Sequence, residues 1–158
     1  MNKPKNKGFA EISVSYKSKK KFDKMPFIRN STEAQRLFRK IWSDKIEHVE
    51  EVYVLLLNHS KRALGYSKVS MGGFSVALTD RRVIFQIALK GNASSIIIAH
   101  NHPSGNLRPS EQDLKLSQYI KRAGEIMDIP LIDHLIMTKD GFKSLADEGK
   151  LQTGYDKI

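Results

Sequence analysis

Two histidines stand two residues apart, His100 and His102, where the apolar run 94–99 meets a loop rich in proline and glycine. If a strand continues through them, both imidazoles project to one side while Asn101 points away. Two imidazoles in a water-accessible loop can ligate a first-row metal. Asp113, eleven residues beyond His102 in the first turn of the next expected helix, can fold back as a third ligand. Three protein ligands with one open position are typical of a catalytic zinc rather than a closed structural one.

Each part of this pattern also has a structural interpretation. A His-x-His pair alone is weak evidence for a metal, and Ser110 followed three residues later by Asp113 matches a helix N-cap with an acidic first turn. The two roles are compatible, because a capped helix terminus fixes the direction in which Asp113 points. The complete spacing is therefore more specific than its parts.

The composition and the absence of certain motifs exclude several other kinds of functional site. The chain has no cysteine, which excludes disulfides, Cys-type zinc fingers, thiolate nucleophiles and Cys-ligated iron–sulfur clusters. The sequence contains no H-E-x-x-H helix, no P-loop, no G-x-G-x-x-G after a strand and no zinc-deaminase signature. Any metal must be held by histidines and carboxylates.

The positive charge is concentrated at the N-terminus. The 158 residues carry a net charge of +10, and within residues 1–24 eight lysines against Glu11 and Asp23 give +6, which leaves +4 for the remainder. We expect residues 1–24 to form a basic flexible tail with a first strand at 12–17, and residues 25–158 to form one domain. The tail could contact nucleic acid or another acidic partner. The apolar runs are too short to span a membrane and no secretory signal is recognisable, so we expect a cytoplasmic protein without membrane association.

The remaining patterns predict the elements that position the candidate ligands. Asn30 with Glu33 resembles a capping box, and the next helix has one apolar face, formed by Ala34, Leu37, Phe38, Ile41 and Trp42. Residues 52–57 and 63–69 predict a hairpin, 80–89 a helix capped by Asp80, 94–99 a buried strand, 110–127 a helix weakened by Gly124, and 131–137 a last strand. This alternation indicates one α/β domain with a mixed sheet flanked by helices.

The ligand pattern resembles the motif of a known family. His-x-His, seven residues, Ser, two residues and Asp is similar to the JAMM motif of MPN+/JAB metalloproteases, and residues 100–105 and 108–113 resemble the RadC family. The segments 50–58, 88–99 and 129–136 are also similar to RadC segments, so that the resemblance covers roughly residues 30–148. It implies a single JAB/MPN-like (cytidine-deaminase-like) domain that binds Zn²⁺ and hydrolyses a peptide or isopeptide bond.

The resemblance also implies a glutamate that acts as general acid and base. Glu50 and Glu51 compete for this role, and on an extended chain they face opposite sides. Periodicity cannot choose between them, because the following run is apolar on both faces. The family pattern assigns the role to Glu50, and both could instead be charges at a strand edge. The resemblance further implies that Ser110 stabilises an oxyanion, with plain N-capping as the alternative.

The other polar residues are expected to play supporting parts. His134 is expected to be buried or to support the ligands, His48 and His59 to be solvated, and Asn101 to form hydrogen bonds around the site. Two alternatives to an enzyme remain. One is a DNA-associated repair or mobile-element accessory protein that binds DNA through the tail, although the helix-hairpin-helix-type region usual in RadC proteins is not recognisable before residue 30. The other is a metal-binding scaffold without turnover.

Overall fold

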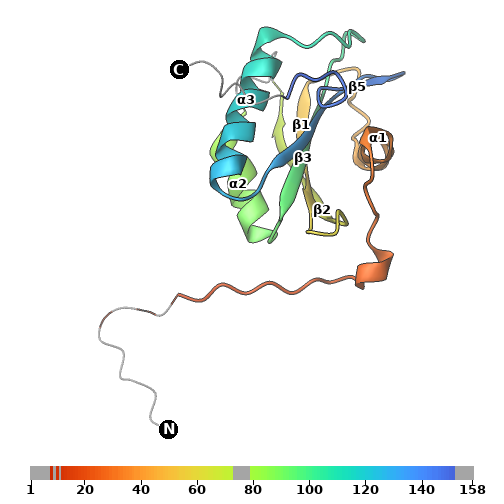
Figure 1. Cartoon of the computed structure of the whole chain (residues 1–158). Helices are drawn as coiled ribbons and strands as arrows, with labels where there is room; N and C mark the ends of the chain where they lie inside the picture. The colour runs from red at the N-terminus through yellow and green to blue at the C-terminus, as the bar shows by residue number, and fades with distance from the viewer. Residues whose placement is uncertain (1–7, 9, 11, 73–78, 152–158) are drawn as a thin grey trace.

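The centre of the molecule is a mixed sheet, seen in a computed structural model that describes residues 8, 10, 12–72 and 79–151 (Figure 1). Within these residues the sheet has five strands in the order β2-β1-β3-β4-β5. Strands β3 and β4 are parallel and the other neighbours are antiparallel. The strands are β1 Glu51–Leu57, β2 Ala63–Met71, β3 Ser95–Asn101, β4 Leu131–Met137 and β5 Phe142–Ser144. The predicted α/β class with a mixed sheet is confirmed.

Helices cover both faces of this sheet. Figure 1 shows α2 (Arg81–Lys90) and α3 (Glu111–Ile126) on one face and α1 (Ser31–Ile41) on the other. Every residue of β1 is buried. The even-numbered apolar residues of β1 pack into the cluster that contains α2 and α3, and the odd-numbered ones pack with α1. Burial on both faces explains why this strand is one continuous apolar run without alternation.

Side chains cap α1, α2 and α3 at the residues that the sequence predicts, Asn30, Asp80 and Ser110. Asn30 accepts a hydrogen bond from the backbone N–H of Glu33, and Asp80 accepts one from that of Arg82. The Glu33 carboxylate accepts from the backbone N–H of Arg29, one residue before the cap. Each cap satisfies an N–H group that has no partner inside its helix.

Gly124 lies inside α3 for a steric reason. A Cβ atom at this position would lie 2.4 Å from the carbonyl oxygen of Ile129, closer than any real contact allows. The backbone N–H of Ile129 donates to the Gly124 carbonyl at 2.8 Å, which turns the chain tightly from α3 towards β4. The glycine that weakens the helix therefore permits the close approach of the next segment.

The strand expected at residues 12–17 does not form. Ile12 and Val14 are 90% and 95% exposed, and residues 12–17 have no strand assignment. An alternating pattern supplies one apolar face, but a strand also needs a neighbour for its backbone hydrogen bonds. The described edges of the sheet are β2 and β5, and neither pairs with this segment. Residues 1–7, 9 and 11 of the expected tail, and 73–78 and 152–158 of the expected domain, lie outside the described residues.

Two short elements have no counterpart among the predictions. A single 3-10 turn, η1 Phe22–Lys24, lies within the segment that was expected to be a flexible tail, and β5 has three residues. Both are too short for a periodic pattern to reveal. No helix in the described part of the chain is long and apolar enough to cross a lipid bilayer.

Candidate metal centre

The topology of the sheet brings the expected ligands and both candidate glutamates to one edge. Because β1 and β3 are antiparallel, with Val52 opposite His100, the beginning of β1 lies beside the end of β3. The chain then passes through the loop 102–109 and enters α3 at the same edge. Residues from three separate segments therefore meet at the carboxyl end of β3, where α/β sheets commonly carry their sites.

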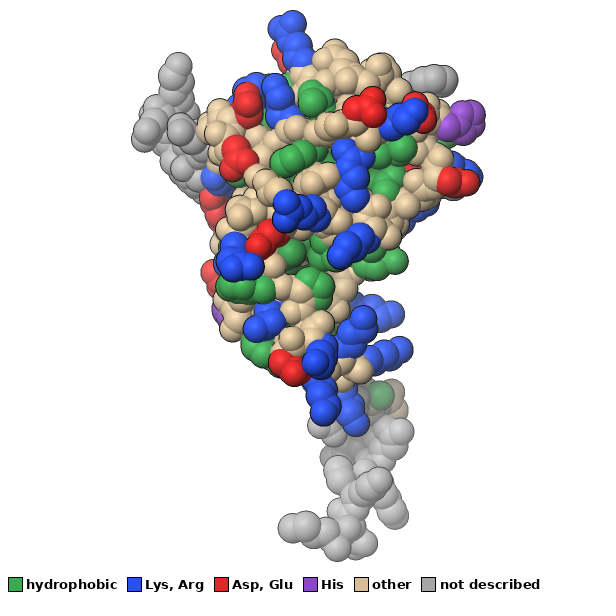
Figure 2. Space-filling view, turned by 90° about the vertical axis from the view of Figure 1, so that its right-hand side faces the viewer, with side chains coloured by type: hydrophobic (Ala, Val, Ile, Leu, Met, Phe, Trp, Pro, Cys, Tyr) green, Lys and Arg blue, Asp and Glu red, His purple; other side chains and the backbone are tan. Residues whose placement is uncertain are grey.

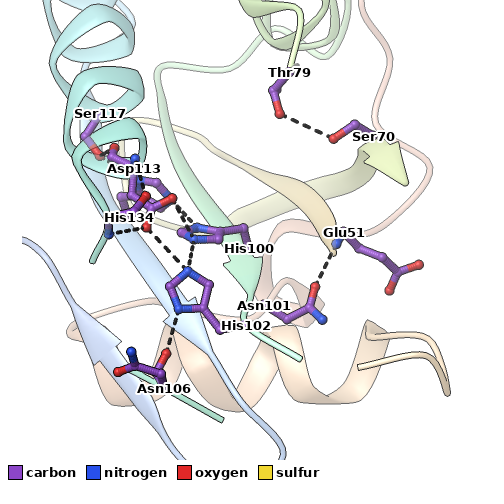
Figure 3. A network of polar contacts seen from close by, with 11 residues as sticks. Glu51, Ser70, Thr79, His100, Asn101, His102, Asn106, Asp113, Ser117 and His134 are labelled. Carbon is purple, nitrogen blue, oxygen red and sulfur yellow. Dashed lines mark hydrogen bonds and ion pairs between the residues drawn. The ribbon is translucent and has the colours of Figure 1, made fainter. Parts of the chain in front are cut away.

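His100 and His102 face each other at this edge. His100 is the next-to-last residue of β3 and fully buried, whereas His102 follows the strand and is half-buried. Their Nε2 atoms are 2.9 Å apart (Figure 3). Both rings lie on one side of the strand, as the i and i+2 spacing predicts.

Asp113 completes the group from the first turn of α3. Its Oδ1 lies 3.1 Å from His100 Nε2 and its Oδ2 lies 3.3 Å from His102 Nε2. The capping box aims this carboxylate: Asp113 Oδ2 accepts from the Ser110 backbone N–H at 2.7 Å, and Ser110 Oγ accepts from the Asp113 N–H at 3.1 Å. The N-cap and the candidate-ligand arrangement are thus parts of one local structure.

The charges in this group are strongly coupled. Burial alone would raise the pKa of Asp113, but the contacts with His100 and His102 outweigh it and hold that pKa far below its usual range. The Asp113 carboxylate in turn raises the pKa of His102, against the opposing effect of burial. Asp113 is therefore ionised, and the space between the three side chains favours positive charge.

The two adjacent glutamates lie in different surroundings. Glu50, His100, His102 and Asp113 each offer one donor atom, and these atoms all lie within 4.8 Å of one another. The Glu51 side chain is fully buried, and its carboxylate contacts Lys68 Nζ at 2.5 Å and Ser43 Oγ at 2.6 Å. In Figure 3 that carboxylate points away from the histidines. The strand alternation separates the two side chains, and the tertiary structure places Glu50 with the candidate ligands.

Asn101, between the two histidines, supports the backbone that carries Glu50. Its Oδ1 accepts from the Glu51 N–H at 2.7 Å, and its Nδ2 donates to the carbonyl oxygens of Ile46 and Val49 at 2.7 and 2.9 Å. Asn101 is fully buried. It forms hydrogen bonds around the site, as expected, but with the backbone ahead of β1 rather than with the candidate ligands.

His134 and Ser117 lie directly behind the candidate ligands. His134, on β4, is fully buried, and its Nε2 lies 2.7 Å from His100 Nδ1. Its Nδ1 lies 2.5 Å from Ser117 Oγ, which donates to the Asp113 carbonyl at 2.8 Å. Burial and the neighbouring His100 lower the pKa of His134 well below its usual value, so the ring is neutral. The prediction of a buried His134 is confirmed.

Ser117 had no place in the sequence interpretation, although one signal points to it. It follows Asp113 by four residues on an expected helix, and positions i and i+4 lie on the same helical face. His48 and His59 are exposed and lie outside this group, as predicted.

The donor atoms fit a tetrahedral zinc ion. Ligand atoms about 2.0–2.1 Å from such an ion lie about 3.3 Å from one another. The contacts among His100, His102 and Asp113 span 2.9 to 3.3 Å. His102 Nδ1 lies 2.6 Å from the Asn106 carbonyl oxygen, which can only accept, so the neutral ring carries its hydrogen there and presents a lone pair at Nε2. A carboxylate and an imidazole lone pair that converge in this way are suited to hold a metal cation between them.

Comparisons with known proteins identify a family for this chain. The RadC-like JAB domain family matches residues 28–150. A UPF0758 protein of Flavobacterium johnsoniae is 42% identical over 100 residues, which are 63% of this chain and 44% of the relative. A UPF0758 protein of Porphyromonas gingivalis is 48% identical over 103 residues, 65% of this chain and 45% of the relative.

A longer match extends over most of the chain. A UPF0758 protein of Clostridium kluyveri is 35% identical over 142 residues, which are 90% of this chain and 61% of the relative. The chain thus matches between 44% and 61% of the length of these relatives. From the family match and these identities together, the chain belongs to the RadC-like JAB domain family.

Proposed function

We propose that the protein is a zinc-dependent metallohydrolase of the JAMM type that cleaves a peptide or isopeptide bond. The observation that carries this proposal is the convergence of Glu50, His100, His102 and Asp113 within 4.8 Å at the end of β3. Two imidazoles and one carboxylate leave a coordination position open, which is the arrangement of catalytic rather than structural zinc sites. Zinc bound there would supply Lewis-acid chemistry, which lowers the pKa of water to about 7 and polarises a carbonyl.

Glu50 is the residue that moves the proton. A carboxylate oxygen of Glu50 takes a proton from the attacking water and then delivers it to the leaving amine nitrogen. This role requires the carboxylate to lie within reach of a water between it and the ligands, which the 4.8 Å spread of the donor atoms allows. Glu51 cannot take this part, because Lys68 and Ser43 hold its buried carboxylate.

Ser110 supports the carbonyl oxygen of the substrate. Ser110 Oγ accepts from the Asp113 N–H, so its hydroxyl hydrogen can be directed towards the oxyanion that develops beside the beginning of α3. The same side chain caps the helix and aims Asp113. Because capping uses the oxygen lone pair and oxyanion stabilisation uses the hydrogen, one hydroxyl serves both purposes.

The test of this function separates metal binding from hydrolysis. Zinc content is measured for the wild-type protein and for His100→Ala and Asp113→Ala, and hydrolysis is measured on a library of peptides and isopeptide-linked lysines. We expect both variants to lose stoichiometric zinc. Glu50→Gln should keep zinc and lose hydrolysis, whereas Glu47→Gln, at an exposed glutamate that pairs with Lys139, should keep both.

Three results would contradict the proposal. Stoichiometric zinc in His100→Ala or Asp113→Ala overturns the ligand assignment, and undiminished hydrolysis by Glu50→Gln overturns the role of that glutamate. Zinc-bound wild-type protein that cleaves no member of the library supports a metal-binding scaffold instead.

A second candidate function is non-specific contact with DNA through the basic segment, residues 17–24. All five of its lysines are exposed, and Figure 2 shows Lys and Arg side chains gathered at the lower end of the molecule. Phe22 and Phe27 are 52% and 44% exposed, and the Arg62 guanidinium lies 4.9 and 5.6 Å from their ring centres. Exposed aromatic rings among cations suit both phosphate contacts and base stacking.

Salt dependence tests this second function. Binding of labelled single-stranded and duplex DNA is followed by fluorescence anisotropy over a salt series, for the wild type and for a triple Gln variant at Lys19, Lys20 and Lys21. The matched control is a triple Gln variant at the exposed Lys90, Lys115 and Lys139. We expect weaker binding and a shallower salt slope in the first variant only. Equal losses in both variants would show that net charge, not the basic segment, binds DNA.

A further inference from the structure

We propose that Ser117 and His134 form a directed hydrogen-bond relay that holds His100 in the tautomer able to bind a metal through Nε2. This inference rests on the proposed metal centre and assigns positioning roles to two residues behind it. The relay joins α3, β4 and β3, and all three side chains are fully buried. Figure 3 shows Ser117, His134 and His100 together beside Asp113.

The direction of the relay is decided at Ser117. Its hydroxyl has one hydrogen, and Oγ lies 2.8 Å from the carbonyl oxygen of Asp113, a group that can only accept. The hydrogen therefore points to Asp113, and Ser117 Oγ presents a lone pair to His134 Nδ1 at 2.5 Å. It follows that His134 carries a hydrogen on Nδ1.

The same reasoning applies to the contact between His134 and His100. A neutral imidazole with a hydrogen on Nδ1 has a lone pair on Nε2. His134 Nε2 lies 2.7 Å from His100 Nδ1, so His100 must donate through Nδ1. The lone pair of His100 is then on Nε2, which faces Asp113 Oδ1 and His102 Nε2.

The opposite direction would disable the ligand. If Ser117 donated to His134, then His134 would donate through Nε2 to His100, whose own hydrogen would lie on Nε2 between the candidate ligands. The Asp113 carbonyl contact disfavours this arrangement, because it would leave Ser117 Oγ 2.8 Å from the carbonyl oxygen with no hydrogen between the two atoms. Because the three groups are fully buried, water cannot substitute as the acceptor or donor that fixes the tautomer.

Sheet register and helix spacing place these residues together. His134 on β4 is paired with Ile98 on β3, two residues before His100, so His134 and His100 lie on the same face of the sheet. Ser117 lies one helical turn after Asp113 on α3, which covers that face. One turn of α3 therefore supplies both a candidate ligand and the residue that sets the direction of the relay.

The relay can be tested with substitutions that keep or break the direction of its hydrogen bonds. The measured quantity is the affinity of each variant for zinc. His134→Leu removes the relay with a similar volume, whereas His134→Gln can donate to Ser117 and accept from His100. Ser117→Ala removes the residue that sets the direction. We expect His134→Leu to lower zinc affinity by about 10–100-fold, Ser117→Ala to lower it less, and His134→Gln to restore most of it. Affinity is measured by competition with a chromophoric chelator, and folding by circular dichroism and thermal unfolding of the zinc-free proteins.

A second measurement reads the tautomers directly. Long-range ¹⁵N–¹H spectra of zinc-loaded, ¹⁵N-histidine-labelled wild-type protein should show hydrogens on Nδ1 of both His100 and His134. A hydrogen on Nε2 of His134, or wild-type zinc affinity in folded His134→Leu, overturns the relay. Zinc binding without hydrolysis by the wild type contradicts the proposed function while leaving the relay intact. A wild-type protein that binds no zinc overturns both.

Discussion

Asn101 Oδ1 accepts the backbone N–H of Glu51 at 2.7 Å, and so connects the strand of the candidate ligands to the segment that carries Glu50. Asn101 lies between His100 and His102, and its side chain projects to the opposite side of β3. Three consecutive residues thus serve two purposes. His100 and His102 face the candidate metal position, and Asn101 fixes the backbone beside the candidate acid/base Glu50.

Replacing Asn101 should separate these two purposes. We expect Asn101→Ala to keep zinc, because His100 and His102 are unchanged, but to lower kcat by about 10²-fold, because Glu50 loses its fixed backbone. Three lost hydrogen bonds in a buried place should also lower the free energy of unfolding by about 2–3 kcal/mol. Zinc content, kcat and chemical denaturation measure these effects.

The matched control is Asn58→Ala at the far end of β1, where Asn58 Oδ1 accepts from the Arg62 N–H. This variant should lose stability without loss of kcat. If Asn101→Ala and Asn58→Ala have the same kcat, Asn101 does not position Glu50.

Replacing Glu51 and replacing Lys68, the two partners of one ion pair, should lower the stability of the protein by unequal amounts. The Glu51 side chain is 0% exposed and that of Lys68 is 34% exposed. Lys68→Met leaves a carboxylate without its cation in a buried place and should lower the free energy of unfolding by about 3 kcal/mol. Glu51→Gln leaves an ammonium that water can reach and should cost less.

Urea denaturation of both variants and of the double variant measures this asymmetry. The double variant should recover part of the loss of Lys68→Met, because no uncompensated buried charge remains. A larger loss in Glu51→Gln than in Lys68→Met would contradict this account of the pair.

Zinc should stabilise the folded protein through the candidate ligands. A ligand that binds only the folded state at 100 times its Kd adds about 2.7 kcal/mol, which corresponds to a rise in Tm of about 5–10 °C for a chain of this size. Differential scanning fluorimetry with and without zinc should show this rise for the wild type and not for His100→Ala. His59→Ala, at an exposed histidine outside the group, should keep the rise. An equal rise in His100→Ala would place the zinc elsewhere.

The Glu33 carboxylate should make stability depend on pH at the start of α1. The hydrogen bond from the Arg29 backbone N–H, helped by the Arg29 side chain and opposed by partial burial, lowers the pKa of Glu33 from 4.5. A carboxyl group whose pKa is lower in the folded state stabilises the protein above its unfolded pKa and loses this contribution as the pH falls through the folded pKa. Glu33→Gln should therefore lower Tm at pH 7, and the difference should shrink below pH 4.5. A difference in Tm that stays constant between pH 7 and pH 3 would show that the charge of Glu33 contributes nothing.

Local patterns in the sequence were sufficient for the helices, for four of the strands and for the group His100, His102 and Asp113. Caps such as Ser110 and apolar periodicity depend on residues within a few positions of one another, so they can be read without the fold. The spacing of the two histidines and the capping of α3 are local in the same sense. The alternation at residues 12–17 was misleading, because a strand also needs a partner from elsewhere in the chain.

Only the tertiary structure decided between Glu50 and Glu51 as neighbours of the candidate ligands. Strand β1 is buried on both faces, so its sequence carries no alternation that distinguishes one side from the other. The packing of β1 between β2 and β3 distinguishes the two glutamates. It brings Glu51 into an ion pair with Lys68 and places Glu50 beside His100. The contact of Ser117 with His134 likewise needs α3 to lie over β4, since these residues are 17 positions apart. Chemistry that depends on neighbours within one element was visible in the sequence, and chemistry that depends on neighbours across elements required the fold.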